Sequence, residues 1–129
     1  DKSYLANYGI DSDKRAGAIP LSAQTITHFT IRDESKIDIK TPVVDKFAPL
    51  NHVRGGIPPI LLVTGDREFE MVGRYEENAY LFRMLKIHGN KDCTLYELQG
   101  HDHGSMVQPA MKPLKDFIAR VRPAEQQGK

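Results

Sequence analysis

The clearest apolar pattern is the short run from Ile60 to Val63, which follows Gly and Pro residues and ends just before Gly65. A continuous apolar run between turn residues predicts a strand that is buried on both faces. From Arg74 to His88, apolar residues recur at spacings of three and four, which predicts an amphipathic helix. Gly89 stands where a left-handed C-terminal cap is expected, and residues 93–98 then predict a second strand.

A strand, a helix and a strand in this order predict a βαβ unit with parallel strands and a right-handed crossover. Residues 16–22 are a candidate third strand, and an apolar pattern up to Val121 predicts a closing helix with Pro109 or Pro113 in its first turn. Residues 25–53 form a long connection, of a length that is usual for functional loops or for segments with short helices. The predicted fold class is therefore α/β.

The composition excludes several classes of function and leaves the predicted fold class unchanged. The chain has 129 residues, with 18 basic and 17 acidic side chains and a net charge of +1. That length suffices for a core, and a scattered, near-neutral charge argues against nucleic acid or an anionic membrane as a partner. No apolar run approaches the roughly 18 residues of a membrane span. The single cysteine, Cys93, excludes an internal disulfide and is most simply a small buried apolar residue.

Candidate chemistry follows the two predicted strands. An acidic loop with Asp66 and Glu68 comes after the first strand, and a loop with His101, Asp102 and His103 comes after the second. The carboxyl ends of parallel strands meet at one edge of a sheet, where ligands bind in open α/β folds. A carboxylate that holds an imidazole is two-thirds of a catalytic triad, because the anion fixes the tautomer and stabilises the imidazolium.

Three stretches together resemble the C-terminal half of an α/β-hydrolase of the esterase/lipase type: residues 58–68, the helical Glu-Glu-Asn at 76–78, and residues 102–106. The resemblance implies a partial α/β-hydrolase fold, with the triad acid after the penultimate strand and the histidine after the last. It assigns Glu68 as the acid, three positions after the loop glycine, with Asp66 as the alternative. It favours His103, which a glycine follows, over His101.

The family's nucleophile lies in a Gly-x-Ser-x-Gly turn, and no serine of this chain has that surrounding. The resemblance therefore implies that residues 1–121 are the C-terminal half of the domain, with the nucleophile expected upstream of residue 1 and a flexible tail at 122–129. The implied activity is hydrolysis of a small-molecule carboxylic ester without cofactor or metal, and the chain alone is expected to be inactive. Its partner would be the N-terminal half of the same domain.

Two other functions compete with this hypothesis. Half of a parallel sheet exposes a strand edge, so the chain could be a non-catalytic module that docks onto a complementary half or associates with itself. His101, Asp102 and His103 have a ligand spacing that suits a metal, but no other histidine brings a companion motif, which disfavours a metal site. Ser22 and Ser105, the hydroxyls nearest the predicted crevice, are expected to be structural. His28 and Phe29, in the long connection, could belong to a cap over the acyl pocket, as inserted segments do in this family, or to a plain loop.

Overall fold

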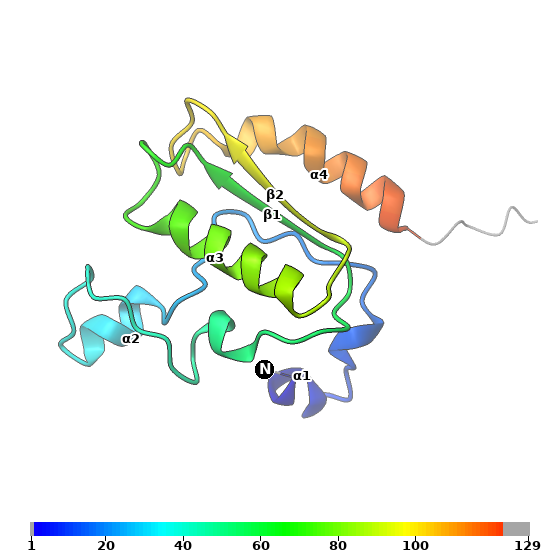
Figure 1. Ribbon diagram of the computed structural model, residues 1–129, viewed down its shortest axis with the longest axis horizontal. Coiled ribbons are helices and arrows are strands. Elements are labelled where there is room, and N and C mark those ends of the chain that lie inside the picture. The colour runs from blue at the N-terminus through cyan, green and yellow to red at the C-terminus, as the bar shows by residue number, and fades with distance from the viewer. Residues whose placement is uncertain (1, 123–129) are drawn as a thin grey trace, which may run out of the picture.

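Two parallel strands form the centre of the computed structural model, which describes residues 2–122 (Figure 1). Strand β1 spans Ile60–Gly65 and β2 spans Cys93–Leu98, with Ile60 paired to Cys93 and Gly65 to Leu98. Helix α3, Arg74–Ile87, connects them. The predicted βαβ unit with parallel strands is confirmed, and the end of β1 lies two residues beyond the predicted one.

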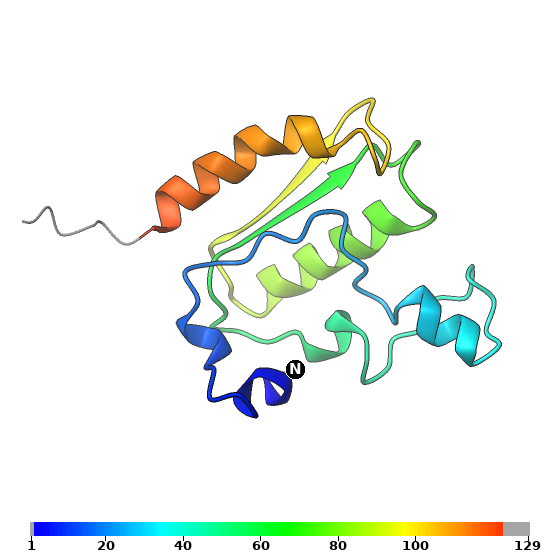
Figure 2. The ribbon, with the colours of Figure 1, turned by 180° about the vertical axis from the view of Figure 1, so that it is seen from behind.

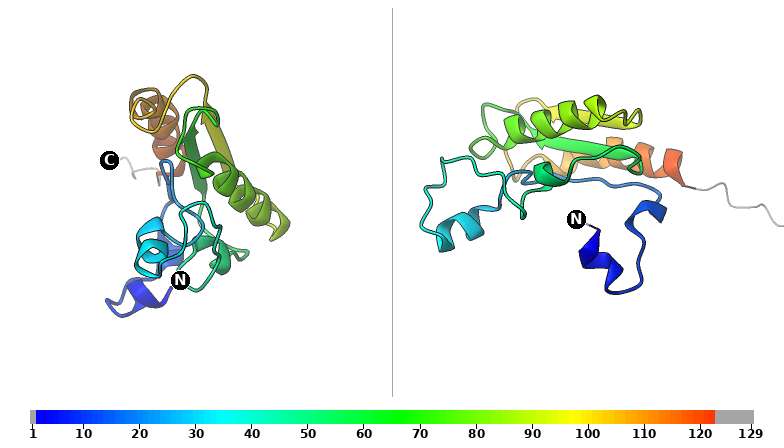
Figure 3. Two further views of the ribbon diagram at one scale, coloured as in Figure 1. Left: turned by 90° about the vertical axis from the view of Figure 1, so that its left-hand side faces the viewer. Right: turned by 60° about the horizontal axis from the view of Figure 1, so that its bottom comes forward.

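Helices cover both faces of this sheet, as Figure 3 shows in the view from the side. Leu61 and Val63 pack toward helix α4, Val107–Val121, in a cluster with Met106 and Phe117. Leu62, which is fully buried, packs on the opposite face in a second cluster, whose other buried members are Leu81, Leu85 and Cys93. The continuous apolar run of β1 thus serves two cores, as a strand buried on both faces requires.

The end of α3 and the start of α4 are each explained by a residue with special backbone properties. Gly89 has φ +83° and donates its N–H to the carbonyl of Lys86 at 2.9 Å, so it provides the left-handed residue just after α3. Pro109 lies in the first turn of α4, where a missing N–H costs no helical hydrogen bond. Pro113 lies inside the helix instead, and the helix continues through it.

Residues 17–21 run beside β1 on the side away from β2 (Figure 2). The predicted third strand is present only as two parallel bridges, Ala18 to Ile60 and Leu21 to Val63. Pro20 explains the interruption, because it accepts from Val63 N but has no N–H to return. The polar backbone groups of Ile19 and Leu21 point away from β1 and have no hydrogen-bond partner among residues 2–122.

The long connection contains short helices, in agreement with one of the two expectations for it. They are α2, Phe29–Glu34, and a 3₁₀ helix at Pro49–His52; α1, Ser3–Ala6, and a 3₁₀ helix at Ser12–Lys14 precede them. His28 caps α2 by accepting from Thr30 N at 3.2 Å. No helix in the described range is long and apolar enough to cross a membrane. Of the expected flexible tail, residues 123–129 lie outside the described range.

Candidate active site

Two loops meet at the edge of the sheet where β1 and β2 end, and Asp66 joins them. Its N–H donates to the carbonyl of His101 at 2.7 Å, and its Oδ2 accepts from Gly100 N at 2.7 Å. The carboxylate is buried, 7% exposed, and is occupied by backbone donors of both loops. Asp66, the alternative acid, therefore joins the two loops, and its carboxylate forms no hydrogen bond to an imidazole among residues 2–122.

Gly65 makes the close approach of these loops possible. A Cβ at this position would lie 2.5 Å from the carbonyl oxygen of His101 and 3.0 Å from Oε2 of Glu70. The first contact is with backbone, which cannot swing aside as a flexible side chain can. Only glycine therefore fits where β1 passes under the histidine loop.

The acidic loop makes a tight turn that decides which carboxylate faces inward. The carbonyl of Asp66 accepts from both Phe69 N at 3.0 Å and Glu70 N at 2.8 Å. Glu68 is exposed at the outer side of this turn, while Glu70 returns to the strand end. The structure thus brings Glu70, five positions after Gly65, into contact with His103, and it does not bring Glu68 to the imidazole.

Glu70 and His103 are in hydrogen-bond contact at the mouth of the edge. Oε1 of Glu70 lies 2.9 Å from Nδ1 of His103 and also accepts from Met71 N at 3.0 Å. Oε2 accepts from Gly65 N at 3.0 Å. The carboxylate side chain is 1% exposed, whereas the imidazole is 49% exposed. The buried carboxylate of Glu70 is thus held by backbone N–H groups, and one edge of the imidazole ring is exposed to solvent.

Ser22 completes the contacts of the pair. Its hydroxyl donates to Oε2 of Glu70 at 2.8 Å and lies 2.9 Å from Nδ1 of His103. Because that hydroxyl has only one proton and gives it to Glu70, both oxygens near Nδ1 are acceptors. Nδ1 must then carry a proton, and the lone pair of the neutral ring is on Nε2. No group among residues 2–122 forms a hydrogen bond to Nε2.

The hydrogen bonds of Glu70 also set its charge state. Burial alone would raise its pKa, but the N–H groups of Met71 and Gly65, the Ser22 hydroxyl and His103 together hold the pKa below its usual range. Glu70 is therefore ionised at neutral pH in spite of its burial. An ionised acceptor at Nδ1 holds the ring in the orientation that leaves Nε2 free to accept a proton.

The other candidates of the histidine loop build its backbone. Asp102 Oδ1 accepts from Gly104 N at 3.0 Å and Ser105 N at 2.7 Å, and Ser105 Oγ accepts from Asp102 N at 3.0 Å. His101 contributes its backbone carbonyl to the hydrogen bond from Asp66 N. Within the described range, no group of three or more His, Cys, Asp or Glu side chains is arranged to hold a metal ion. Cys93 is buried in the second core cluster, which it shares with Leu62.

Arg67 ties the acidic loop to β2 through Glu97. Its Nε and Nη2 donate to Oε1 and Oε2 of Glu97 at 2.8 and 2.6 Å, a bidentate pair. This hydrogen-bonded guanidinium lowers the pKa of Glu97 from 4.5 to about 2. The pair therefore helps to hold the loop that carries Glu70.

We expect this pair to contribute stability at neutral pH and to lose that contribution in acid. A carboxyl whose pKa is lower in the folded chain stabilises the fold above its unfolded pKa, and the gain disappears as the pH falls from about 4.5 to about 2. Urea unfolding of the chain and of Glu97→Gln should show a stability gap at pH 7 that closes near pH 2. Thr94→Ser on the same strand, which changes no charge, should give the same gap at both pH values. A Glu97→Gln gap that persists in acid would contradict the assignment.

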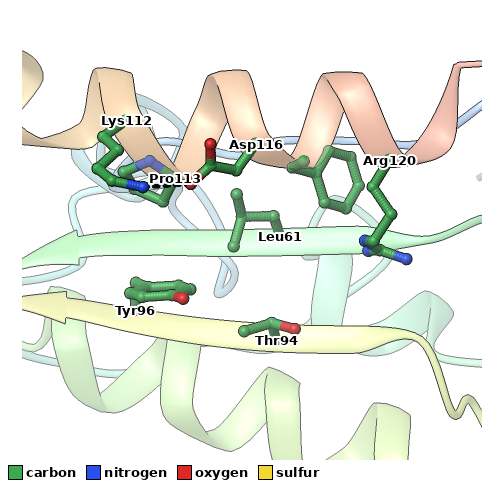
Figure 4. Close-up of a pocket in the computed structure, with 8 residues that line it drawn as sticks. Leu61, Thr94, Tyr96, Lys112, Pro113, Asp116 and Arg120 are labelled. Carbon is green, nitrogen blue, oxygen red and sulfur yellow. Dashed lines mark hydrogen bonds and ion pairs between the residues drawn. The ribbon is translucent and has the colours of Figure 1, made fainter.

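A shallow groove between the sheet and α4 is separate from this site (Figure 4). Leu61, Thr94 and Tyr96 form its strand side, and Lys112 and Asp116 form an ion pair of 2.7 Å on its helix side. It contains neither Glu70 nor His103. No histidine lines the groove, so the sheet edge remains the candidate active site.

The sequence pointed to His103 and to both loops, but not to Glu70 or to the contacts of Ser22 with these two residues. The expectation for the acid was a fixed number of positions after the loop glycine. In the structure, the turn at residues 66–70 determines which carboxylate side chain points toward His103. The one available signal was Asp66 itself, since Asp at the start of a loop commonly forms a turn with the residues that follow. Ser22 is 48 residues away from Glu70 in sequence, so no local pattern could join them.

The parallel strands, the helices on both faces and the loops at the carboxyl edge together form a partial α/β fold. No family model matches the sequence, and no curated protein does. Among solved structures, the chain is similar to esterase 2 of Thermogutta terrifontis phosphoramylated by tabun, with a TM-score of 0.63 and 19% identity over 84% of this chain and 42% of that one.

The native form of this thermophilic planctomycete esterase gives a TM-score of 0.63 at 18% identity, over 88% of this chain and 45% of that one. Its propionate-bound form gives 0.62 at 18% identity, with the same coverage. The chain thus spans less than half the length of these structures. At such low identity, the likeness is one of fold.

Proposed function

We propose that this chain is the C-terminal part of a serine hydrolase that cleaves carboxylic esters, and that it supplies the acid Glu70 and the base His103. The observation that carries the proposal is the hydrogen-bond contact between the buried, ionised Glu70 and Nδ1 of His103, with Nε2 unpaired among residues 2–122. This is the acid–histidine half of a triad. The proposal keeps the reaction that the sequence implied and replaces Glu68 by Glu70 as the acid.

In this mechanism His103 moves the proton at each step. Nε2 takes the proton of a serine hydroxyl as its oxygen attacks the ester carbonyl, and then gives it to the departing alcohol. Water, activated by the same nitrogen, hydrolyses the acyl-enzyme. Glu70 stays ionised and stabilises the imidazolium that forms in both stages. The sequence of steps needs no cofactor or metal.

The nucleophile is proposed to come from sequence upstream of residue 1. Ser22 is not suited to the role, because its hydroxyl is beside Nδ1 and gives its proton to Glu70. The open edge of residues 17–21 supports a further strand there, since the N–H and C=O groups of Ile19 and Leu21 lack partners in the described range. Such a strand would belong to the N-terminal half of the same domain.

The substrate is proposed to be a small ester with a short acyl group. The solved structures that resemble this chain include propionate- and butyrate-bound forms of the Thermogutta esterase. That likeness concerns the fold, so it guides the choice of assay. p-Nitrophenyl acetate and butyrate are the substrates with which to begin.

The test uses the full gene product, with whatever sequence precedes residue 1, beside the 129-residue chain. We expect the gene product to hydrolyse p-nitrophenyl butyrate and to be labelled by a fluorophosphonate on a serine outside the 129 residues. The chain alone should show neither. Labelling of a serine within the chain, or a gene product without turnover, would refute the proposal.

The open edge also favours the alternative that the chain is a non-catalytic association module. That alternative predicts no fluorophosphonate labelling in any form of the protein. Labelling therefore separates the two functions.

A further inference from the structure

A buried ion pair lies at the start of α3, directly behind the candidate site. Nε of Arg74 is 3.0 Å from Oε1 of Glu77, and the two side chains are 7% and 6% exposed. Buried charges are expensive to desolvate unless further hydrogen bonds complete them. The other partners of this pair therefore indicate what it does.

All of those partners that belong to the backbone lie in one segment, residues 22–26. Arg74 Nη1 donates to the carbonyl of Ser22. Oε2 of Glu77 accepts from Thr25 N at 2.7 Å and from Ile26 N at 2.8 Å. Asn78, one residue further along the helix, donates to the carbonyl of Ala23 at 2.6 Å. The first turn of α3 thus holds the chain where it leaves β1.

Ser22 needs such support because its backbone is in the left-handed region, with φ +43°. Non-glycine residues seldom adopt this conformation unless their surroundings impose it. Its N–H donates to Val63 O at 2.7 Å, and its carbonyl is held by Arg74. Held at both ends, Ser22 directs its hydroxyl between Glu70 and His103.

We propose that Ser22 and Arg74 are positioning residues of the Glu70–His103 pair. Arg74, neutralised by Glu77, fixes the backbone of Ser22, and the Ser22 hydroxyl fixes the Glu70 carboxylate and keeps the imidazole proton on Nδ1. Their part in catalysis rests on the proposed function, whereas their effect on the tautomer does not.

The exposure of the ring explains why a second contact matters. With 49% of its surface open, the imidazole has few neighbours to restrain it. Without the Ser22 hydroxyl, Nδ1 keeps only one acceptor, and Oε2 of Glu70 keeps only the Gly65 N–H. Held by one contact instead of two, the exposed ring turns away from Glu70 part of the time, and in those orientations the proton can move to Nε2, which then cannot accept the proton of a nucleophile.

The experiment reads the tautomer by long-range ¹H–¹⁵N spectra of the histidine rings in the 129-residue chain. We expect a proton on Nδ1 of His103 in the parent chain, and a larger Nε2–H fraction in both Ser22→Ala and Ser22→Gly. Glycine relieves the left-handed backbone, so it guards against simple misfolding. Ser35→Ala, which removes an exposed hydroxyl at the end of α2, is the matched control and should leave the tautomer unchanged.

Arg74→Lys separates charge from geometry. Lysine keeps a positive charge near Glu77 but lacks the planar fork that reaches both Glu77 and Ser22. We expect the tautomer of His103 to shift in the same direction as in the Ser22 variants, but by a smaller amount. Unchanged tautomer fractions in Ser22→Ala and Ser22→Gly would overturn the proposal, and an unchanged fraction in Arg74→Lys would remove Arg74 from it.

In the esterase-active gene product, the Ser22 variants should lower kcat by about tenfold to a hundredfold, as the loss of one hydrogen bond to a charged group predicts, with little change in KM. A tautomer shift in a protein without esterase activity would refute the proposed function and leave the positioning role intact. A normal kcat together with an altered tautomer would refute the catalytic part of the inference.

Discussion

Esterase activity of the gene product should fall by about 10³- to 10⁴-fold when Glu70 is replaced by Gln, the loss expected when the acid of a triad becomes an amide. Gln has nearly the same shape, but it can present an N–H to Nδ1 of His103. The ring then changes to the tautomer with its proton on Nε2, and this nitrogen can no longer act as a base. Steady-state hydrolysis of p-nitrophenyl butyrate gives kcat and KM for the comparison.

Glu68→Gln is the matched control for that experiment. It is the same chemical change two positions earlier in the same loop, at an exposed side chain without contact to His103. We expect its activity to stay within about twofold of the parent protein, as for an exposed substitution away from such contacts. A large loss with Glu68→Gln and a small one with Glu70→Gln would return the acid to the position that the sequence suggested.

Gly65→Ala should have the largest effect on stability among single-atom changes near the site. The new Cβ would lie 2.5 Å from the backbone oxygen of His101, so the two loops must separate. The hydrogen bond from Asp66 N to that oxygen, 2.7 Å long, is then lost. Overpacking together with one lost hydrogen bond costs roughly 2–4 kcal/mol of unfolding free energy. Urea denaturation measures it directly.

Gly104→Ala tests whether the effect is specific. Gly104 is in the histidine loop, but a Cβ there would meet nothing closer than Asp102 Oδ1 at 3.7 Å. Its unfolding free energy should change by no more than about 0.5 kcal/mol. Equal losses for the two glycines would mean that the clash at Gly65 does not limit the approach of the loops.

The parts of the fold that could be predicted are those that a local pattern encodes. The run at 60–63 and the spacing between 74 and 88 each describe an element by its own burial, and Gly89 marks an end by its backbone freedom. The third strand was less complete than predicted because Pro20 cannot return a hydrogen bond to β1. The first turn of α3 departed from a simple amphipathic helix, since it buries Arg74 and Glu77.

The candidate site divides along the same line. His103 could be chosen from the sequence because it follows a strand that the sequence itself predicts. Glu70 could not, because the direction of its side chain depends on two hydrogen bonds to the Asp66 carbonyl. Ser22 reaches the site through contacts with distant parts of the chain, among them Val63 and Arg74. Tertiary contacts of this kind leave no periodic trace.

Every group that holds the imidazole comes from one continuous stretch of sequence, from Ser22 to His103. These contacts are therefore encoded as a single block. A gene fusion, a chain break or a recombination point placed before residue 22 would leave these contacts whole. A different upstream segment joined to this block would leave the groups that surround Nδ1 unchanged.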